Sequence, residues 1–379
     1  MRQRTPAITR RRRDELVQRV QHATEAVDVF AAASTRLRRL LPFDAAAWMT
    51  TDPATGLPTA PTRLDDLGEP RPDLCTSQWR REFLVDDVVL YRDLARAERP
   101  AGALRAAVRD PRQSARYREF LHPLGFDDEL RAVLRVGASP WGVFSLLRRR
   151  GEAPFSQDET ALVASLSAPL GEALRARVRP AESLRGLLRH DPPGFLLFDR
   201  RGALTSANEQ ARAWLAELPH ERCLPSDLGV GVPMWMMATV FRAAAVSRGQ
   251  GDGTARARVR SRRGPWLVCH ASCLGDADGS IGSVAVVIEP AKAAEIAPII
   301  VEAYGLSERE QQITRLIARG SSTAEMADEL FLSGHTVRDY VKAVFHKVGV
   351  TSRGELVAKL FADHYEPVHL QNVVDVHND

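Results

Sequence analysis

The chain has 379 residues, 44% of them apolar, and a formal net charge of +4. At about 150 residues per domain this length predicts two or three folded domains. No uninterrupted apolar run reaches the ~20 residues that a membrane-spanning helix needs, so no membrane contact is expected. No apolar stretch follows the cluster Arg10–Arg13, so no secretory signal is expected and the sequence predicts a cytoplasmic protein.

The first part of the chain alternates between helical and strand patterns. Apolar residues at three- and four-residue steps predict a helix over about 11–41, and a strand follows at 45–50. A hairpin of two strands is predicted over 130–147, and Ser156 then begins a helix with a capping box. This order of elements resembles a GAF domain over residues 14–178, which implies an α/β sensory domain.

A second unit is predicted after Arg179-Pro180. Residues 194–199 and 203–207 read as paired strands around a tight turn, and Asn208 can cap the helix that follows. Three further strands are predicted near 255–260, 266–274 and 281–288. The pattern resembles a PAS domain over residues 182–290, and an Ala- and Ile-rich connecting helix is expected at 291–304.

Two groups of residues in these domains are expected to be structural rather than ligand-binding. The alternating arginines Arg256, Arg258 and Arg260 are expected on the solvated face of an edge strand. Five aromatic side chains are expected in the cores rather than in a ligand site. They are Trp48, Trp141, Phe144, Trp235 and Trp266.

From Gly305 onward, four N-cap signatures follow one another. Ser307 with Glu310, Ser322 with Glu325 and Ser352 with Glu355 have capping-box spacing, and Ser333 precedes Thr336 by three residues. Gly320 stands where a left-handed residue ends the first helix. The caps predict four short helices joined by connections of a few residues.

The local charge changes sign within this segment. Residues 306–332 carry three basic and five acidic side chains, whereas Asp339 is the only acidic residue in 333–353. The basic residues of the latter stretch are Arg338, Lys342, Lys347 and Arg353. A short turn at Phe331–Ser333 joins a supporting helix to the helix over about 334–348, and this geometry lets the second helix enter the major groove of DNA.

The segment closely resembles the LuxR-type helix-turn-helix. The matching stretches are Leu306-Ser307-Glu308-Arg309-Glu310, Ala318-Arg319-Gly320, Ser322 to Ala327, Leu332-Ser333 with Thr336-Val337-Arg338, and Lys347-Val348-Gly349-Val350 with Arg353-Gly354-Glu355-Leu356-Val357. The domain is placed at residues 305–363, followed by a tail at 364–379. Tyr340 departs from the family, which usually has His there, and Asp339 lies on a turn that often faces bases.

The resemblance implies specific DNA contacts. Base contacts are expected from Arg338, Asp339 and Lys342, with the Asp accepting from cytosine N4. Phosphate contacts are expected from Thr323, Ser333, Thr336, Lys347 and Arg353. The last helix resembles the dimer-forming helix of the family, so a homodimer on paired half-sites of double-stranded DNA is expected.

The predicted fold class is α+β multidomain: GAF-like and PAS-like α/β sensory domains followed by an all-α four-helix LuxR-type domain. The predicted function is a transcription regulator gated by a small-molecule or protein signal. Two alternatives remain: N-terminal domains that dock proteins and bind no small molecule, and an enzyme with an accessory DNA-binding domain. No nucleophile elbow, His-Glu-x-x-His or P-loop appears, so no catalytic residue is expected. Neither a cofactor nor a metal is expected, since no His or Cys pair completes a site with Cys269 and Cys273.

Overall fold

The computed structural model describes residues 6–68, 71–178, 192–219, 223–251, 253–275, 281–292, 295–296, 299 and 302–360. The chain divides into two compact units. The first comprises residues 1–177 and 191–290, and within it we define a first lobe (residues 6–177) and a second lobe (residues 192–290). In the second unit the longest described stretch is residues 302–360.

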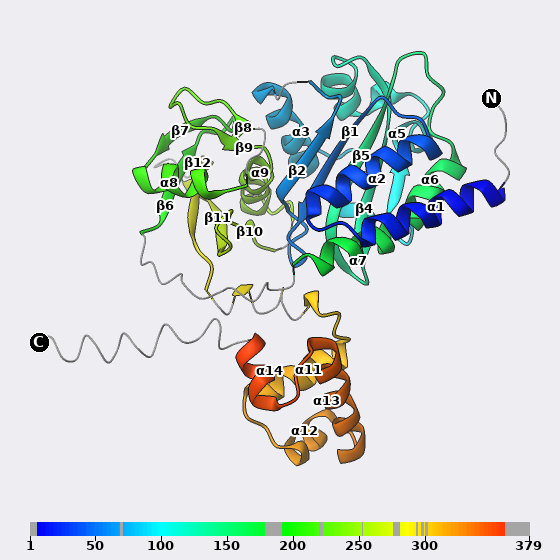
Figure 1. The fold of residues 1–379 in the computed structure, drawn as a ribbon. Helices are drawn as coiled ribbons and strands as arrows, with labels where there is room; N and C mark the ends of the chain where they lie inside the picture. The colour runs from blue at the N-terminus through cyan, green and yellow to red at the C-terminus, as the bar shows by residue number, and fades with distance from the viewer. Residues whose placement is uncertain are drawn as a thin grey trace, which may run out of the picture. The chain divides into compact units, whose positions relative to one another are not determined.

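The first lobe is a five-stranded antiparallel sheet between helices (Figure 1). Its helices are α1 (Pro6–Gln21), α2 (Ala26–Leu40), α3 (Pro72–Leu84), α4 (Tyr91–Leu94), α5 (Leu104–Ala107), η1 (Pro111–Gln113), η2 (Tyr117–Leu121), α6 (Gln157–Ser165) and α7 (Ser167–Ala176). Its strands are β1 (Ala45–Thr51), β2 (Pro58–Asp65), β3 (Ala101–Ala103), β4 (Phe126–Val136) and β5 (Ser139–Arg149), in the order β2-β1-β5-β4-β3.

The two faces of this sheet have different partners. On β1 and β5, Trp48 and Phe144 point to one face, where their rings stack with centroids 4.2 Å apart and Phe30 of α2 packs beside them. Helices α1, α2 and α7 cover that face. The alternate positions, including Met49 and Ser145, point to the other face, because successive side chains of a strand alternate. That second face is covered by α3.

The second lobe contains another antiparallel sheet. Its strands are β6 (Gly194–Phe198), β7 (Leu204–Ala207), β8 (Cys223–Leu224), β9 (Val232–Pro233), β10 (Arg256–Arg260), β11 (Trp266–Gly275) and β12 (Ile281–Pro290), and its helices are α8 (Glu209–Glu217) and α9 (Met236–Ser247). The main sheet has the order β10-β11-β12-β6-β7, while β8 and β9 form a separate pair. The five strands predicted from the sequence are therefore those of the main sheet. Asn208 caps α8 by accepting from the Ala211 amide, as its position predicted.

The two lobes share one hydrophobic core. Helix α3 of the first lobe packs against α9 of the second (Figure 1). Trp79 of α3, together with Trp235 and Met236 at the start of α9, belongs to a single cluster of buried residues that continues into both lobes. The two predicted sensory domains therefore form one compact unit.

A buried ion pair also joins the lobes. Asp52, in the turn after β1, receives the Arg258 side chain from β10 at 2.7 Å (Nε to Oδ2) and 2.6 Å (Nη2 to Oδ1), and the Arg258 amide at 3.0 Å. The expectation that Arg258 is solvated is wrong, since only 3% of the residue is exposed. The physical reason is that β10, an edge strand of its own sheet, lies against the first lobe.

The expected aromatic core is largely confirmed. Trp48, Trp141, Phe144 and Trp235 are buried, and Trp266 is partly buried. No helix among the described residues is both long and apolar enough to cross a membrane. Much of the predicted connecting helix and the whole C-terminal tail lie outside the described residues.

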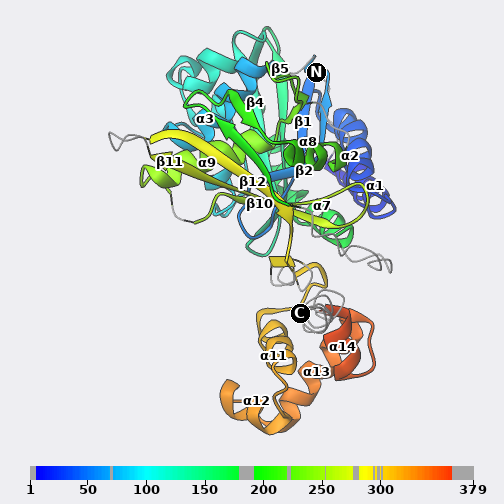
Figure 2. The same cartoon turned by 90° about the vertical axis from the view of Figure 1, so that its left-hand side faces the viewer.

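Residues 305–360 of the second unit form a bundle of four short helices (Figure 1 and, from another side, Figure 2). They are α11 (Glu308–Ala318), α12 (Thr323–Leu330), α13 (Gly334–Val348) and α14 (Arg353–Leu360). Helix α13 packs on α11 and α12, and α14 packs on α11. The predicted α/β sensory part followed by an all-helical domain is therefore the observed fold class.

The predicted N-caps of the bundle are confirmed. The hydroxyls of Ser307, Ser322 and Ser333 accept from the amides three residues later. Ser352 does the same for Glu355, but the Glu355 carboxylate returns to the Thr351 amide rather than to that of Ser352. Each cap satisfies amides that the first helical turn leaves unpaired.

Candidate nucleic-acid interface

Helix α13 has a buried apolar face and an exposed polar face. Val337, Val344 and Val348 are buried in the bundle, and they recur at helical spacing. On the helix surface away from them, Arg338 and Lys342 are exposed. A spacing of four residues places these two cations on one side of the helix, as the sequence predicted.

The exposed cations of α13 are available for a ligand. Within the part of the chain that the structure describes, no hydrogen bond or ion pair holds the guanidinium of Arg338 or the ammonium of Lys342. Both side chains can therefore reach a negatively charged or acceptor-rich surface without first breaking an internal contact. Binding a phosphate or a guanine edge would then cost these groups mainly side-chain entropy.

The third predicted base contact has a partner that sequence reasoning missed. Asp339 lies 3.0 Å from His335 (Oδ2 to Nδ1), and both side chains are exposed, at 57% and 80%. The pair follows from i,i+4 spacing on the same helix, which is the feature that could have revealed it. His335 thus orients Asp339 and adds another polar group to the exposed face of α13.

The turn before α13 is tight and contains an unusual residue. Phe331 ends α12 with φ of +54°, a left-handed conformation that few non-glycine residues adopt, and its side chain is 94% exposed. Ser333 then caps α13, accepting from the Thr336 amide at 3.1 Å, and the two hydroxyls lie 2.8 Å apart. The hydroxyls that were predicted to hold phosphates thus stand together at the N-terminus of α13, where amides and the helix dipole favour anions.

Lys347 makes contacts inside the bundle. Its ammonium lies 2.6 Å from Glu310 Oε2 and 3.2 Å from the Gly305 carbonyl oxygen. Burial raises the pKa of Glu310, but the bonds from Lys347 and Ser307 outweigh this and leave the pKa below its usual value. Lys347 therefore ties the end of α13 to the start of α11.

Arg353 and Thr323 are also joined to one another. Arg353, the first residue of α14, donates to the Ser321 carbonyl oxygen and to the Thr323 hydroxyl, each at 2.9 Å. Both acceptors lie at the start of α12. Arg353 thus fixes α14 against the N-terminus of the supporting helix.

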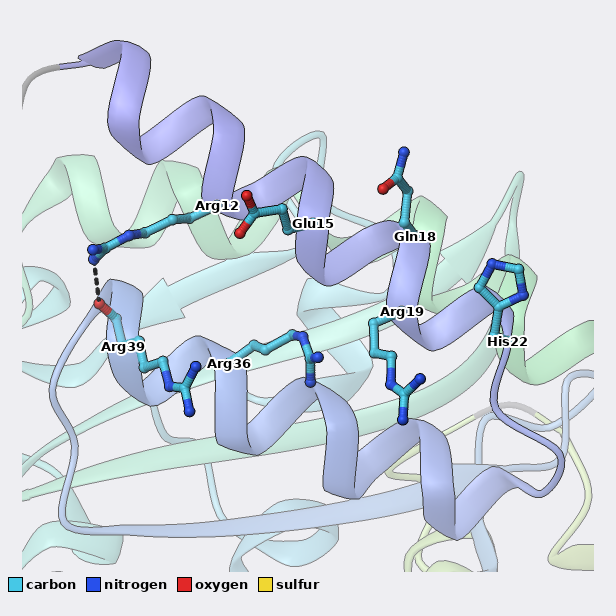
Figure 3. Close-up of a pocket in the computed structure, with 7 residues that line it drawn as sticks. All are labelled: Arg12, Glu15, Gln18, Arg19, His22, Arg36 and Arg39. Atoms are coloured by element: carbon cyan, nitrogen blue, oxygen red, sulfur yellow. Dashed lines mark hydrogen bonds between the residues drawn. The ribbon is translucent and has the colours of Figure 1, made fainter.

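A second group of cations lies in the first unit. Figure 3 shows a groove between α1 and α2 with polar side chains along both helices. Its lining residues are Arg12, Glu15, Gln18, Arg19, His22, Arg36 and Arg39. The groove is open, and its surface charge is the feature it shares with α13. Replacing a cation of this groove can therefore serve as a control for replacing a cation of α13, because the two sites are far apart in sequence.

Comparisons with known proteins match the helical bundle. Residues 305–360 match the family described as "Bacterial regulatory proteins, luxR family". The chain is 36% identical over 58 residues to the transcriptional regulatory protein DesR of Bacillus subtilis, covering 15% of this chain and 29% of DesR. It is 36% identical over 55 residues to the spore germination protein GerE of the same organism, covering 14% of this chain and 74% of GerE.

Solved structures resemble larger parts of the chain at lower identity. A crystal structure of Escherichia coli SdiA is 13% identical and covers 92% of this chain and 96% of that chain, with a TM-score of 0.35. The GAF domain of a phosphoenolpyruvate-protein phosphotransferase from Coxiella burnetii is 14% identical and covers 45% of this chain and 95% of that one, with a TM-score of 0.29. The family match falls on the four capped helices, and the match to GerE spans most of that protein, so the chain belongs to the luxR family of bacterial regulatory proteins.

Proposed function

We propose that the protein is a sequence-specific regulator of transcription that binds double-stranded DNA through α13. The observation that carries this proposal is the exposed pair Arg338 and Lys342 on a helix braced by α12 across a three-residue turn. Such a helix fits the major groove, where Arg and Lys read guanine. Because its partner is DNA, the proposal places the protein in the cytoplasm of its cell.

The proposed contacts divide by chemistry. Arg338 and Lys342 read base edges, and Asp339 accepts from a cytosine N4 while His335 orients it. Three hydroxyls bind phosphate oxygens at the N-termini of α12 and α13. They belong to Thr323, Ser333 and Thr336.

Both cations among the predicted phosphate contacts have partners inside the bundle. Lys347 already pairs with Glu310, and Arg353 already donates to α12. We propose that both mainly brace the bundle and touch phosphates only in addition. Their replacement would then lower the stability of the bundle as well as its DNA affinity.

The proposed assembly is a homodimer on paired half-sites. A two-fold symmetric protein reads a palindromic site with two copies of α13, which doubles the number of contacts. The first unit is proposed to modulate this binding in response to a signal. No residue is proposed to carry out catalysis.

Lys342→Ala tests the proposed function. A site selected from random DNA by the full-length protein should bind the variant roughly 5- to 150-fold more weakly, which corresponds to the ~1–3 kcal/mol of one base-reading contact. Repeating the selection with the variant should relax one position of the site. Fluorescence anisotropy at fixed salt measures the affinity, because phosphate contacts make it salt-dependent.

Arg19→Ala is the matched control. It removes one positive charge from an exposed helix of the first unit and should leave the affinity for the selected site nearly unchanged. Unchanged affinity and unchanged selection in Lys342→Ala would refute the proposed groove-facing surface. Equal losses of DNA affinity in both variants would show that binding depends only on the overall charge of the protein.

A second candidate role for the first unit is to dock other proteins without binding a small molecule. Native mass spectrometry of the purified full-length protein distinguishes small-molecule binding from protein docking, because a retained small molecule adds a defined mass. A cavity of about 360 Å³ between the sheet of the first lobe and α3 favours the small molecule.

A further inference from the structure

The groove between α1 and α2, the α1–α2 groove, has two parts. Figure 3 shows the first part, which has a volume of about 840 Å³ and is far larger than an inorganic ion needs. A second part shares Arg19, His22 and Arg36 with the first and extends toward the start of α2. The further lining residues of this second part are Ala23, Thr24, Asp28, Ala31, Ala32 and Thr35.

The shape of the α1–α2 groove follows from the helical hairpin that forms it. Only residues 22–25 connect the two helices, so α1 and α2 run antiparallel and pack along each other. Packed helices have axes about 8–10 Å apart, and the ridges of a third helix fit between them. The lining from Arg12 to His22 spans about 15 Å of helix, which is about three turns. The groove is therefore long enough to hold a short helix.

The first part of the groove is cationic. Four arginines and a histidine line it, and Glu15 is the one carboxylate among its described lining residues. That carboxylate already pairs with Arg11, at 3.0 Å between Oε1 and Nε. Glu15 therefore does not offset the positive charge of the groove.

Two of the arginines are available for a ligand. Arg19 of α1 and Arg36 of α2 extend into the space between the helices (Figure 3). Within the part of the chain that the structure describes, no hydrogen bond or ion pair holds either guanidinium. Arg12 has one long hydrogen bond, 3.4 Å from Nη1 to the Arg39 carbonyl oxygen. Like charges held close together repel one another, and an anionic partner would relieve that repulsion.

The second part of the groove is lined by small side chains. Ala31, Ala32 and Thr35 follow one side of α2, and the distance between packed helices depends on the side chains at their contact. A partner backbone can therefore lie close to α2 here. Asp28 accepts from the Thr24 hydroxyl and the Glu25 amide, so its carboxylate is used at the helix start.

The lining disfavours two other occupants. Two copies of this groove placed face to face would bring arginine against arginine, which is repulsive. A single-stranded nucleic acid stacks its bases on aromatic side chains, and the described lining residues include none. Carboxylates on a helix match both the charge and the shape, because arginine binds carboxylates through paired N–H donors.

We propose that the α1–α2 groove docks an acidic helical segment of another protein, whose carboxylates bind the arginines of the groove. Docking here does not compete with the cavity under α3, because α1 and α2 cover the opposite face of the sheet. The surface is also distinct from α13. The inference therefore goes beyond DNA binding and gives the first unit a protein partner of defined chemistry.

The probe is a fluorescently labelled, alanine-based peptide with glutamates at three- and four-residue steps. A length of about 20 residues lets it be helical in water. Full-length protein should bind it saturably, at one peptide per chain, as measured by fluorescence anisotropy. Affinity should fall as salt is added, because exposed charges are screened. No saturable binding at low salt would overturn the proposal.

Two further peptides separate charge from shape. Glutamine in place of every glutamate should weaken binding at least about tenfold, because the arginines lose their counter-charges. A central proline in the acidic peptide should also weaken binding at least about tenfold, because it breaks the helix at unchanged charge. Equal affinity of the glutamine peptide would overturn an acidic occupant, and equal affinity of the proline peptide would overturn a helical one.

Arg36→Glu tests the site itself. It places a like charge opposite the acidic peptide and should weaken binding at least about tenfold. Arg109→Glu makes the same charge change at an exposed residue of the first lobe outside the groove and should have little effect. If melting shows that Arg36→Glu is unfolded, Arg19→Glu reverses a charge on the other helix and takes its place. Unchanged binding in a folded groove variant, or an equal loss in Arg109→Glu, would refute the site.

A charge exchange tests direct contact. The double variant Arg19→Glu/Arg36→Glu should bind a peptide with lysine in place of every glutamate more tightly than wild-type protein does. If this peptide gains nothing from the double variant, the two side chains do not contact the docked helix, and the assignment fails.

Competition identifies the other possible occupants. Duplex DNA of scrambled sequence and a single-stranded oligonucleotide should leave the peptide bound. Displacement that is lost in Arg36→Glu but kept in Lys342→Ala would make the groove a nucleic-acid surface. A change of oligomeric state in Arg36→Glu by light scattering, without peptide binding to wild type, would assign the groove to a second copy of the chain. Either result would overturn the proposal and leave the DNA-binding role of α13 to its own test.

Discussion

At the residue scale, Lys347 has a predicted role in binding phosphate and an observed ion pair inside the bundle. Its basic character and its place near the end of α13 predicted a phosphate contact, and its ammonium lies against Glu310 of α11. The two residues are 37 positions apart, so no local pattern relates them. Arg338 and Lys342 are on the exposed side of α13, as their four-residue spacing predicted.

Glu310→Gln should change how the stability of the bundle depends on pH. Because the folded-state pKa of Glu310 is lowered, the carboxylate stabilises the folded state at neutral pH, and this stabilisation is lost as the pH falls through and below 4.5. The loss should be about 1 kcal/mol or less, since Lys347 is partly exposed and screened by solvent. Hydrogen exchange of α11 and α13, corrected for intrinsic rates, measures it.

In Glu310→Gln, the acid-induced part of that loss should disappear, and protection at neutral pH should be lower than in wild type. Glu308→Gln alters an exposed carboxylate in the same helical turn and should retain the wild-type pH dependence. A wild-type bundle whose protection is insensitive to pH between about 5 and 3 would contradict the assignment.

At the scale of the elements, the caps determine where the four helices of the bundle begin. The hydroxyls of Ser307, Ser322 and Ser333 each accept from a backbone amide three residues on, and the amides of Ser307 and Ser322 donate to a glutamate in return. These interactions are local, which is why the sequence predicted them. The left-handed end of α12 at Phe331 was not predicted, because that conformation is typical of glycine.

Ser322→Ala should destabilise α12 by about 1 kcal/mol, the usual loss for an N-cap hydroxyl. The amide of Glu325 loses its acceptor, so exchange in the first turn of α12 should accelerate about fivefold for 1 kcal/mol. Ser321→Ala, one position earlier, changes the same side chain and should have little effect. Equal acceleration in both variants would show that the cap does not set this helix start.

At the scale of the whole molecule, the first unit is more continuous than its two sequence patterns suggest. Its lobes share a core through α3 and α9, and Asp52 pairs with Arg258 across them. The two side-chain hydrogen bonds of this buried ion pair can form only when both lobes are in place. Removing one partner leaves the other as an unpaired buried charge, which is strongly unfavourable.

Asp52→Asn should lower the stability of the first unit by about 3–5 kcal/mol, because Arg258 would remain buried without its counter-charge. Thermal unfolding of the full-length protein followed by tryptophan fluorescence reports this, since Trp48, Trp79 and Trp235 lie in the affected cores. Glu15→Ala breaks the exposed pair with Arg11 and should cost no more than about 0.5 kcal/mol. Similar effects of the two variants would mean that the buried pair does not hold the lobes together.

By itself, the sequence determined the local features of this protein. Residues within a few positions of one another, or a contiguous motif, predicted the helix starts of the bundle, the main sheet of the second lobe, the exposed pair on α13 and the family resemblance. In the first lobe they predicted β1, β4 and β5 but neither β2 nor β3. Only the tertiary structure decided which side chains meet from distant positions: Asp52 with Arg258, Lys347 with Glu310, and the walls of the cavity under α3. The reason is that backbone capping and side-chain periodicity act over one or two turns, whereas burial and charge pairing depend on how whole elements pack.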